Sequence, residues 1–151
     1  MKKRFMFFSA LFVFTIFLTG CGNKKAISTS EFINITKSNG FEIVDAKDQF
    51  DEDMVLEATL AVGDDYKIEF YVLDSEFNAN GMYKYNKSLF ERNKSNVSLY
   101  SSTDLGNYST YMLQSGGHYV YLSRIDNTFL YVDVLEEYKG SVKDIISKLG
   151  Y

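Results

Sequence analysis

The chain of 151 residues has no proline and no tryptophan, and it has only one cysteine and one histidine. A single cysteine, Cys21, excludes an intrachain disulfide and a multi-cysteine metal site. A single histidine, His118, excludes any site that needs two histidines, and no serine stands in a nucleophile-elbow pattern. Gly116-Gly117 has neither the lysine nor the helix start of a phosphate-binding loop. We therefore expect a protein that is not an enzyme and that uses no cofactor.

A long apolar run occurs at the start of the chain, where Phe5 to Leu18 follows Met1-Lys2-Lys3-Arg4. A basic start followed by an apolar segment of this length is typical of a secretory signal. The segment is shorter than the roughly 20 residues that a membrane-spanning helix needs. Two other interpretations stay open: a signal peptide with an incidental cysteine, and an uncleaved N-terminal anchor.

The residues Leu18, Thr19, Gly20 and Cys21 resemble the lipobox of bacterial lipoprotein precursors, in which a branched apolar residue and two small residues precede a cysteine. This resemblance implies cleavage between Gly20 and Cys21 and a diacylglyceryl group on the Cys21 thiol. Residues 1–20 would then be a lipoprotein signal peptide. The mature protein would sit on the outer face of the plasma membrane of a Gram-positive cell, held by its lipid anchor.

Residues 21–26 would form the lipidated cysteine and a short tether, with a reach under roughly 20 Å. Lys24 and Lys25 in this tether could each add about 1 kcal/mol of attraction to anionic headgroups, or they could simply be solvated. Loss of Lys2, Lys3 and Arg4 with the signal leaves an excess of seven acidic side chains. A nucleic-acid partner would favour a basic surface, so we expect none.

Residues 27–151 predict a single α+β domain. Helices are expected after the capping box of Ser28 and Glu31, over residues 76–93 after Ser75, and from Ser141, with Asp144 completing a second capping box. Alternating apolar residues predict strands at 41–44, 54–62, 66–73, 97–101, 108–114, 118–125 and 128–135. The order α-βββ-α-ββββ-α predicts an antiparallel sheet with the helices packed on one face.

One strand–helix stretch carries a second resemblance. Tyr66 to Tyr71, followed by Asp74, Ala79, Met82-Tyr83, Asn86 and Phe90-Glu91, is similar to a pattern in small uncharacterised lipoproteins of low-GC Gram-positive bacteria. The pattern covers about a fifth of the chain. It implies no activity. Asn86, inside the apolar stripe of this helix, predicts a buried amide bonded to the backbone.

The last three strands predict a candidate ligand surface. Taking Ser115-Gly116-Gly117 as a three-residue loop places Gln114 opposite His118, and the two-residue turn Asp126-Asn127 places Leu122 opposite Tyr131. One sheet face then mixes aromatic and polar groups suited to a glycan, a peptide or an envelope protein. The other interpretation is an ordinary solvated sheet face with cross-strand pairs. Its candidate residues are Thr110, Gln114, His118, Arg124, Tyr131 and Asp133.

The acidic loop Asp48–Asp53 offers oxygen ligands for a cation such as Ca²⁺. It lacks the glycine and the terminal glutamate of a calcium loop, so we expect a solvated hairpin and no metal site. His118 beside its turn is expected to be a surface histidine. The sequence therefore predicts a membrane-anchored extracytoplasmic binding module. The alternatives are a protective lipoprotein that intercepts a bacteriocin or phage component, and a hydrolase of envelope substrates.

Overall fold

A computed structural model describes residues 23–50 and 53–151 of the chain. The predictions of a signal peptide over residues 1–20 and of lipidation at Cys21 lie outside these residues. Asp51 and Glu52 of the acidic loop lie outside them as well.

Seven strands form one antiparallel sheet in the order β1-β2-β3-β7-β6-β5-β4, accompanied by three α-helices. The α+β class and the antiparallel sheet are confirmed, whereas the two 3₁₀ helices were not predicted. The elements in chain order are α1 (Thr29–Ser38), β1 (Glu42–Asp45), η1 (Lys47–Gln49), β2 (Val55–Val62), β3 (Lys67–Leu73), α2 (Glu76–Asn93), β4 (Ser98–Leu105), β5 (Tyr108–Ser115), β6 (His118–Ile125), β7 (Thr128–Leu135), η2 (Glu136–Tyr138) and α3 (Lys139–Leu149).

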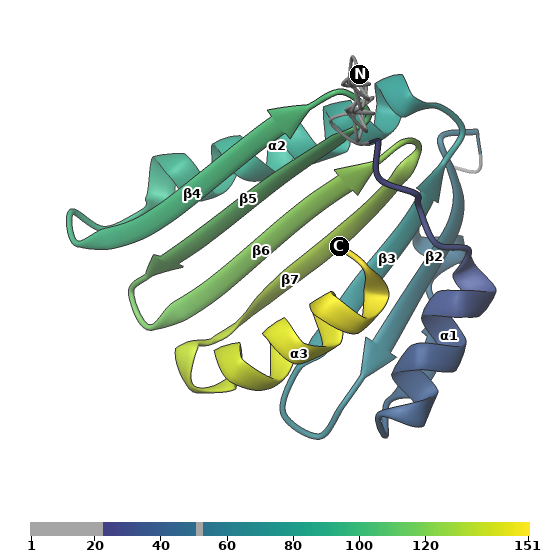
Figure 1. Ribbon diagram of the computed structural model, residues 1–151, viewed down its shortest axis with the longest axis horizontal. Helices are drawn as coiled ribbons and strands as arrows, with labels where there is room; N and C mark the ends of the chain where they lie inside the picture. Colours follow the sequence, from purple (N-terminus) through teal and green to yellow (C-terminus); the bar gives the residue numbers. More distant parts are fainter. Residues whose placement is uncertain (1–22, 51–52) are drawn as a thin grey trace, which may run out of the picture.

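The helices lie on both faces of the sheet: α1 and α3 cover one face and α2 crosses the other (Figure 1). The prediction that all helices pack on one face is therefore wrong. The reason lies in the central strands, which are apolar on both sides. In β6, Tyr119 and Ile125 join the core under α1 and α3, while Val120 and Leu122 join a separate core under α2. A strand buried on both faces needs cover on both faces.

The core under α1 and α3 is dominated by aromatic and branched side chains. Phe32 of α1 stacks on Phe70 of β3 with ring centroids 4.9 Å apart. Tyr151 meets Phe70 edge to face at 6.3 Å, and its hydroxyl forms a hydrogen bond with Thr128 Oγ1. The stripe of α3 completes this core with Val142, Ile145, Ile146 and Leu149.

Helix starts follow the local sequence in two of three cases. Ser28 and Glu31 form the predicted capping box of α1, and the Ser75 side chain accepts a hydrogen bond from the Asn78 backbone N–H at the start of α2. The predicted cap at Ser141 is wrong, because α3 begins earlier at Lys139 with no side-chain cap. The preceding η2 turn runs directly into α3, so its residues supply the first turn.

Strand register decides which side chains share a face. Between β6 and β7 the predicted register is confirmed, with Leu122 opposite Tyr131 and Val120 opposite Asp133. Between β5 and β6 the prediction is wrong, because Ser115 pairs with His118. Gly116 and Gly117 both adopt positive φ, 58° and 80°, and so form a two-residue turn. Such turns match the twist of a hairpin, and the one-residue slip exchanges the faces of β5.

Candidate ligand-binding cleft beside helix α2

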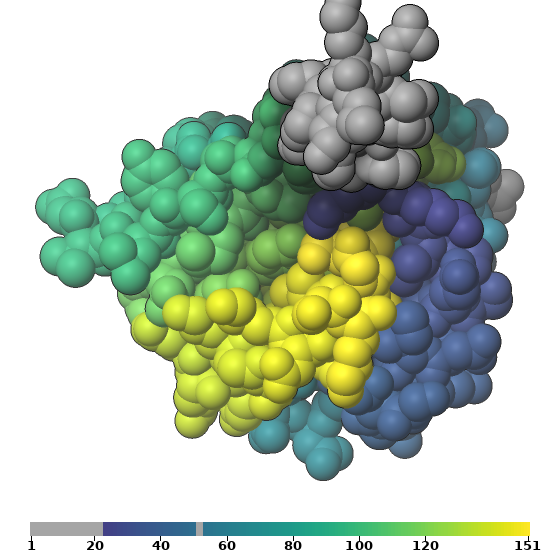
Figure 2. Space-filling view, in the orientation of Figure 1, coloured from purple at the N-terminus to yellow at the C-terminus, as the bar shows by residue number. Residues whose placement is uncertain are grey.

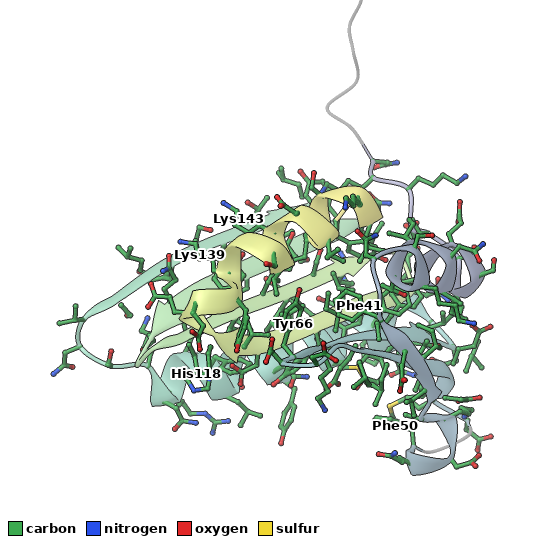
Figure 3. All side chains as sticks on the ribbon, turned by 90° about the horizontal axis from the view of Figure 1, so that it is seen from below. Phe41, Phe50, Tyr66, His118, Lys139 and Lys143 are labelled. Atoms are coloured by element: carbon green, nitrogen blue, oxygen red, sulfur yellow. The ribbon has the colours of Figure 1, made fainter. Side chains whose placement is uncertain are left out.

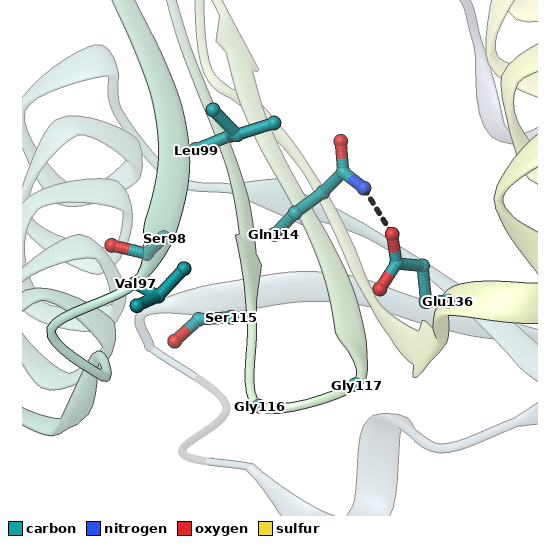
Figure 4. Close-up of a pocket in the computed structure, with 8 residues that line it drawn as sticks. All are labelled: Val97, Ser98, Leu99, Gln114, Ser115, Gly116, Gly117 and Glu136. Carbon is teal, nitrogen blue, oxygen red and sulfur yellow. Dashed lines mark hydrogen bonds between the residues drawn. The ribbon is translucent and has the colours of Figure 1, made fainter.

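The register slip splits the predicted ligand face. Thr110 and Gln114 lie on the α1/α3 side of the sheet, opposite Ser123 and Tyr119. Gln114 lines a hollow of about 280 Å³ between the start of β4 and the Gly116-Gly117 turn (Figure 4). Its Nε2 donates to Glu136 Oε1 at 2.5 Å, and its Oε1 accepts from Lys139 Nζ at 2.6 Å.

The four other predicted residues, His118, Arg124, Tyr131 and Asp133, share the face covered by α2. Arg124 is buried, with only 6% of its surface exposed, so it cannot contact a ligand. Its guanidinium makes long contacts of 3.4 Å to the Asp126 carbonyl and to Ser109 Oγ. The prediction of Arg124 as part of a ligand surface is therefore wrong.

A cleft of about 310 Å³ lies between the C-terminal end of α2 and the ends of β5, β6 and β7. We call it the α2 cleft. Leu113 and Val120 contribute apolar surface from the sheet, and Phe90 contributes an aromatic ring from α2. His118 lies on this side of the sheet, away from Lys139 and Lys143 of α3 (Figure 3). Polar residues complete the lining: Asn93, Lys94, Ser95, Ser115, His118 and Asp133.

His118 and Asp133 form the polar pair of the α2 cleft. His118 Nδ1 lies 2.9 Å from Asp133 Oδ1, with 51% and 30% of the side chains exposed. The two residues occupy diagonal positions on adjacent strands of one face, a spacing that long side chains bridge. Holding the imidazole through Nδ1 leaves Nε2 as the ring nitrogen available to a ligand.

A second hollow of about 260 Å³ lies on the same face and includes Tyr131. The rings of Phe90 and Tyr131, 6.1 Å apart, stand between this hollow and the α2 cleft. Burial, with the carboxylates of Asp133 and Glu69, raises the pKa of Tyr131 to about 12. Its phenol therefore stays protonated near neutral pH and can donate a hydrogen bond. The other lining residues are Phe50, Glu69, Tyr71, Met82, Asn86 and Phe129.

Asn86 on the edge of this hollow is satisfied within its own helix. Its Nδ2 donates to the Met82 carbonyl at 2.9 Å, which confirms the predicted bond to the backbone, but the side chain is half-buried and not buried as predicted. Tyr71 and Glu69 are likewise paired, since the Tyr71 hydroxyl donates to the Glu69 carboxylate. Asn86, Tyr71 and Glu69 are thus already paired, which leaves the Tyr131 hydroxyl as the group of this hollow that can bind a ligand.

Sequence reasoning missed the helix side of the α2 cleft. From the sequence, Phe90 is named only in the strand–helix resemblance, and residues 93–95 are given no role. One signal was available: Phe90 is the last apolar residue of the stripe, and a polar run follows it directly. Ligand pockets are lined mainly by apolar and aromatic side chains with a few polar groups, which is the combination that Phe90 and the polar run provide.

Within residues 23–50 and 53–151, no group of three or more histidine, cysteine or acidic residues could hold a metal ion. Asp48 belongs to η1, and Asp53 precedes β2. Over the same ranges, no helix has the length and apolar character needed to cross a bilayer.

No protein-family model matches the chain, and no curated protein matches its sequence. A solved structure does match its fold: the crystal structure of a GTP binding regulator from Thermotoga maritima. The two chains are 15% identical, with a TM-score of 0.50 over 82% of this chain and 85% of that chain. At this identity the likeness shows a shared fold alone.

Proposed function

We propose that the protein is a lipid-anchored extracytoplasmic binding module that receives its ligand in the α2 cleft. The pairing of an aromatic wall with the His118–Asp133 pair at one cleft carries this proposal. The lipobox-like residues Leu18 to Cys21 support the anchor.

The path of the chain after the anchor supports an orientation for the domain. The Lys24 backbone N–H donates to Asn107 Oδ1 at 3.1 Å, and Asn107 Nδ2 donates to the Lys24 carbonyl at 2.7 Å. Lys24 Nζ also lies 5.1 Å from the ring centroid of Tyr108, on the α1/α3 side. Only Cys21, Gly22 and Asn23 would separate the lipid from this fixed point, a reach of about 10 Å. The α1/α3 side would then face the bilayer and the α2 cleft would open away from it.

The size of the α2 cleft supports a small ligand group. At about 310 Å³ it lies at the lower end of the range for small-molecule sites. It has room for one sugar ring or one peptide side chain. An aromatic wall suits the apolar face of either group, and the imidazole and carboxylate can bind a hydroxyl or amide. We infer that the ligand is one unit of a longer envelope glycan or peptide.

Metabolic labelling with an alkyne fatty acid tests the anchor. The wild-type chain should be labelled and should fractionate with membranes, because its thiol carries acyl chains. The Cys21→Ser variant should lose the label, since no other cysteine exists in the chain. Equal labelling of both chains would reject the anchor and leave the cleft proposal untouched.

Titration of the membrane-extracted protein with soluble cell-wall fragments and envelope peptides tests the cleft. Phe90→Ala should weaken binding at least tenfold, because it removes the aromatic wall. Phe77→Ala is the matched control, since Phe77 lies on the same helix, is 84% exposed and does not line the cleft. Equal effects of both substitutions would place the ligand elsewhere. Turnover of the fragments would favour the hydrolase alternative.

A further inference from the structure

Among residues 23–50 and 53–151, no strand pairs with the outer side of the edge strand β4, and few features of β4 would block such pairing. It pairs with β5 over eight consecutive residues without a bulge, whereas the opposite edge strand β1 has only four residues. Leu99 is 68% exposed, Tyr100 59% and Leu105 49%. Natural edges are usually protected by proline, bulges or several charges, but Asp104 is the only charged residue of β4.

The turn between β4 and β5 fixes which backbone groups of β4 point outward. Leu105 pairs with Tyr108 across the two residues Gly106 and Asn107. In such a hairpin the pair that flanks the turn is hydrogen-bonded, and bonded and non-bonded pairs alternate along the strands. Ser98, Tyr100, Ser102 and Asp104 therefore direct their N–H and C=O groups away from β5.

We propose that β4 pairs antiparallel with β4 of a second copy about a two-fold axis at Ser102, joining two seven-stranded sheets into one. In this register Ser102 faces Ser102 of the second copy, and Tyr100 faces its Asp104. All these residues have outward backbone groups, so each pair exchanges two hydrogen bonds. The partner that pairs with the outer side of β4 is thus β4 of the second copy.

Side chains on both faces of this register are complementary. On the α1/α3 side, Leu99 lies opposite Leu105 of the second copy, which buries two exposed leucines at each end. On the other side, Lys94 Nζ lies 4.2 Å from the ring centroid of Tyr100. Asp104 of the second copy faces that tyrosine, so the ammonium and the carboxylate come together.

Neighbouring registers lack this match. When the two-fold axis is perpendicular to the sheet, two residues that lie opposite each other have their side chains on the same face. The axis must therefore pass beside a residue, and the neighbouring registers are centred at Ser101 and Thr103. A centre at Ser101 places Leu99 opposite Thr103 and Asp104 opposite Ser98. A centre at Thr103 places Leu105 opposite Ser101 and Asp104 opposite Ser102. In each alternative register Leu99 no longer faces Leu105, and Asp104 of the second copy no longer lies near Lys94.

The arrangement of the rest of the molecule allows this pairing. Among the helices that the structure describes, none covers the α1/α3 side of β4 and β5, where the green strands stand clear of yellow α3 (Figure 2). A perpendicular two-fold axis turns the same face of both copies to the same side. Both Lys24 segments then leave on one side of the joined sheet, as two anchors in one membrane require.

Single-cysteine variants of the full chain test the register. They are made with Cys21→Ser, so that the new thiol is the only one, and are oxidised mildly in detergent. Ser102→Cys should give a disulfide-linked dimer faster than its neighbours, because Ser102 lies directly opposite its own copy, with a Cα separation of about 5.5 Å that falls within the range of disulfides. Ser101→Cys and Thr103→Cys should react at least tenfold more slowly, because their thiols lie diagonally. Equal rates, or an equally fast Glu42→Cys on β1, would overturn the proposal.

Sedimentation of the full chain in detergent tests the pairing itself. Ser102→Pro should shift the protein from dimer to monomer, because it removes a central outward N–H while β5 pairing survives. Ser102→Ala is the matched control and should stay dimeric, although both variants lose the hydrogen bond from Lys87 Nζ. Unchanged far-ultraviolet circular dichroism of Ser102→Pro separates lost pairing from unfolding. A wild-type monomer at all accessible concentrations would overturn the proposal.

A charge exchange tests the side-chain contact. Lys94→Glu should weaken the dimer several-fold, because it places two acids together, and Lys94→Glu with Asp104→Lys should restore it. A double variant that remains as weak as the single one would overturn the Ser102-centred register.

Discussion

The two faces of the sheet are built differently. On the α1/α3 side, two helices close over a core in which Phe32, Phe70 and Leu130 are fully buried. On the other side α2 alone crosses the sheet, leaving the α2 cleft and a second hollow around Tyr71. One helix is about 10 Å wide, too narrow for a seven-stranded sheet with strands about 4.8 Å apart. Hollows occur on both sides, since Gln114 lines one on the α1/α3 side, but the larger closed core lies under α1 and α3.

The same contrast holds for polar groups. On the α2 side, Arg124 Nε and the Tyr111 hydroxyl are buried without a hydrogen-bond partner among the described residues. Burying such groups unpaired has a free-energy cost of about 1–3 kcal/mol each. On the α1/α3 side, by contrast, the buried Tyr151 hydroxyl bonds Thr128 Oγ1. Thr29 Oγ1 of α1 is unpaired as well, so the two sides differ in number: among the described residues, Tyr83, Tyr111 and Arg124 all lie on the α2 side.

The largest expected effect lies in the α1/α3 core. Phe32→Ala removes a ring that is fully buried and stacked on Phe70. We expect it to lower the free energy of unfolding by about 3–5 kcal/mol in urea titrations. Phe90→Ala, at the partly exposed margin of the α2 cleft, should lower it by less than half as much. Equal losses would show that both faces are packed alike.

The second-largest effect is expected at alkaline pH, which should lower the free energy of unfolding through Tyr119 of the same core. Burial, with Tyr121 nearby, raises the pKa of Tyr119 from 10.0 to about 12. A group with a raised folded-state pKa contributes its full stability below the unfolded pKa and loses it as pH rises through the folded one. Between pH 10 and 12 we expect a loss of about 2–3 kcal/mol from this residue. Urea titrations across that range should show a smaller loss in Tyr119→Phe.

A smaller effect of opposite sign is expected on the α2 side. Arg124→Met replaces a buried guanidinium that has no ion-pair partner among the described residues with an apolar chain of similar length. Because the charge is desolvated and only weakly bonded, the free energy of unfolding should rise by about 1–2 kcal/mol. A decrease in thermal-unfolding stability would mean that the bonds to Ser109 and Asp126 matter more than desolvation.

The smallest expected effect concerns α2 itself. Gly81 lies within this helix, and an added methyl group there would meet nothing within 4 Å. Gly81→Ala should raise the free energy of unfolding by about 0.5–1 kcal/mol, through helix propensity alone. Gly150→Ala is the contrasting control: its φ of 77° is strained for alanine, so it should destabilise. If both substitutions stabilise the protein, helix propensity is not the cause.

Local signals predicted much of this fold. Ser75 and the apolar stripe gave the bounds of α2, and the turn Asp126-Asn127 gave the register of β6 with β7. The β5–β6 register failed because Ser115-Gly116-Gly117 fits a loop of two or three residues. Only the paired positive φ angles of the two glycines distinguish these possibilities. The difference of one residue in loop length places Thr110 and Gln114 on the other face of the sheet.

The positions of the helices needed information that local periodicity does not contain. The alternation over residues 118–125 predicted a strand, but it did not reveal that β6 is buried on both faces and needs helices on both. The α2 cleft joins Phe90 to His118 and Asp133 across the sheet, so no short segment contains it. Such a site depends on which face each helix covers, which tertiary packing determines.

The link between Lys24 and Asn107 also determines where a mechanical load on the N-terminus would enter the domain. Asn107 Nδ2 contacts both the Lys24 carbonyl and Asp126 Oδ1, so it connects the β4–β5 and β6–β7 turns. A pull transmitted through residue 23 would reach two hairpin turns before it reached α1. Such a load would thus be shared by four strands of the sheet, and α1 would not detach alone.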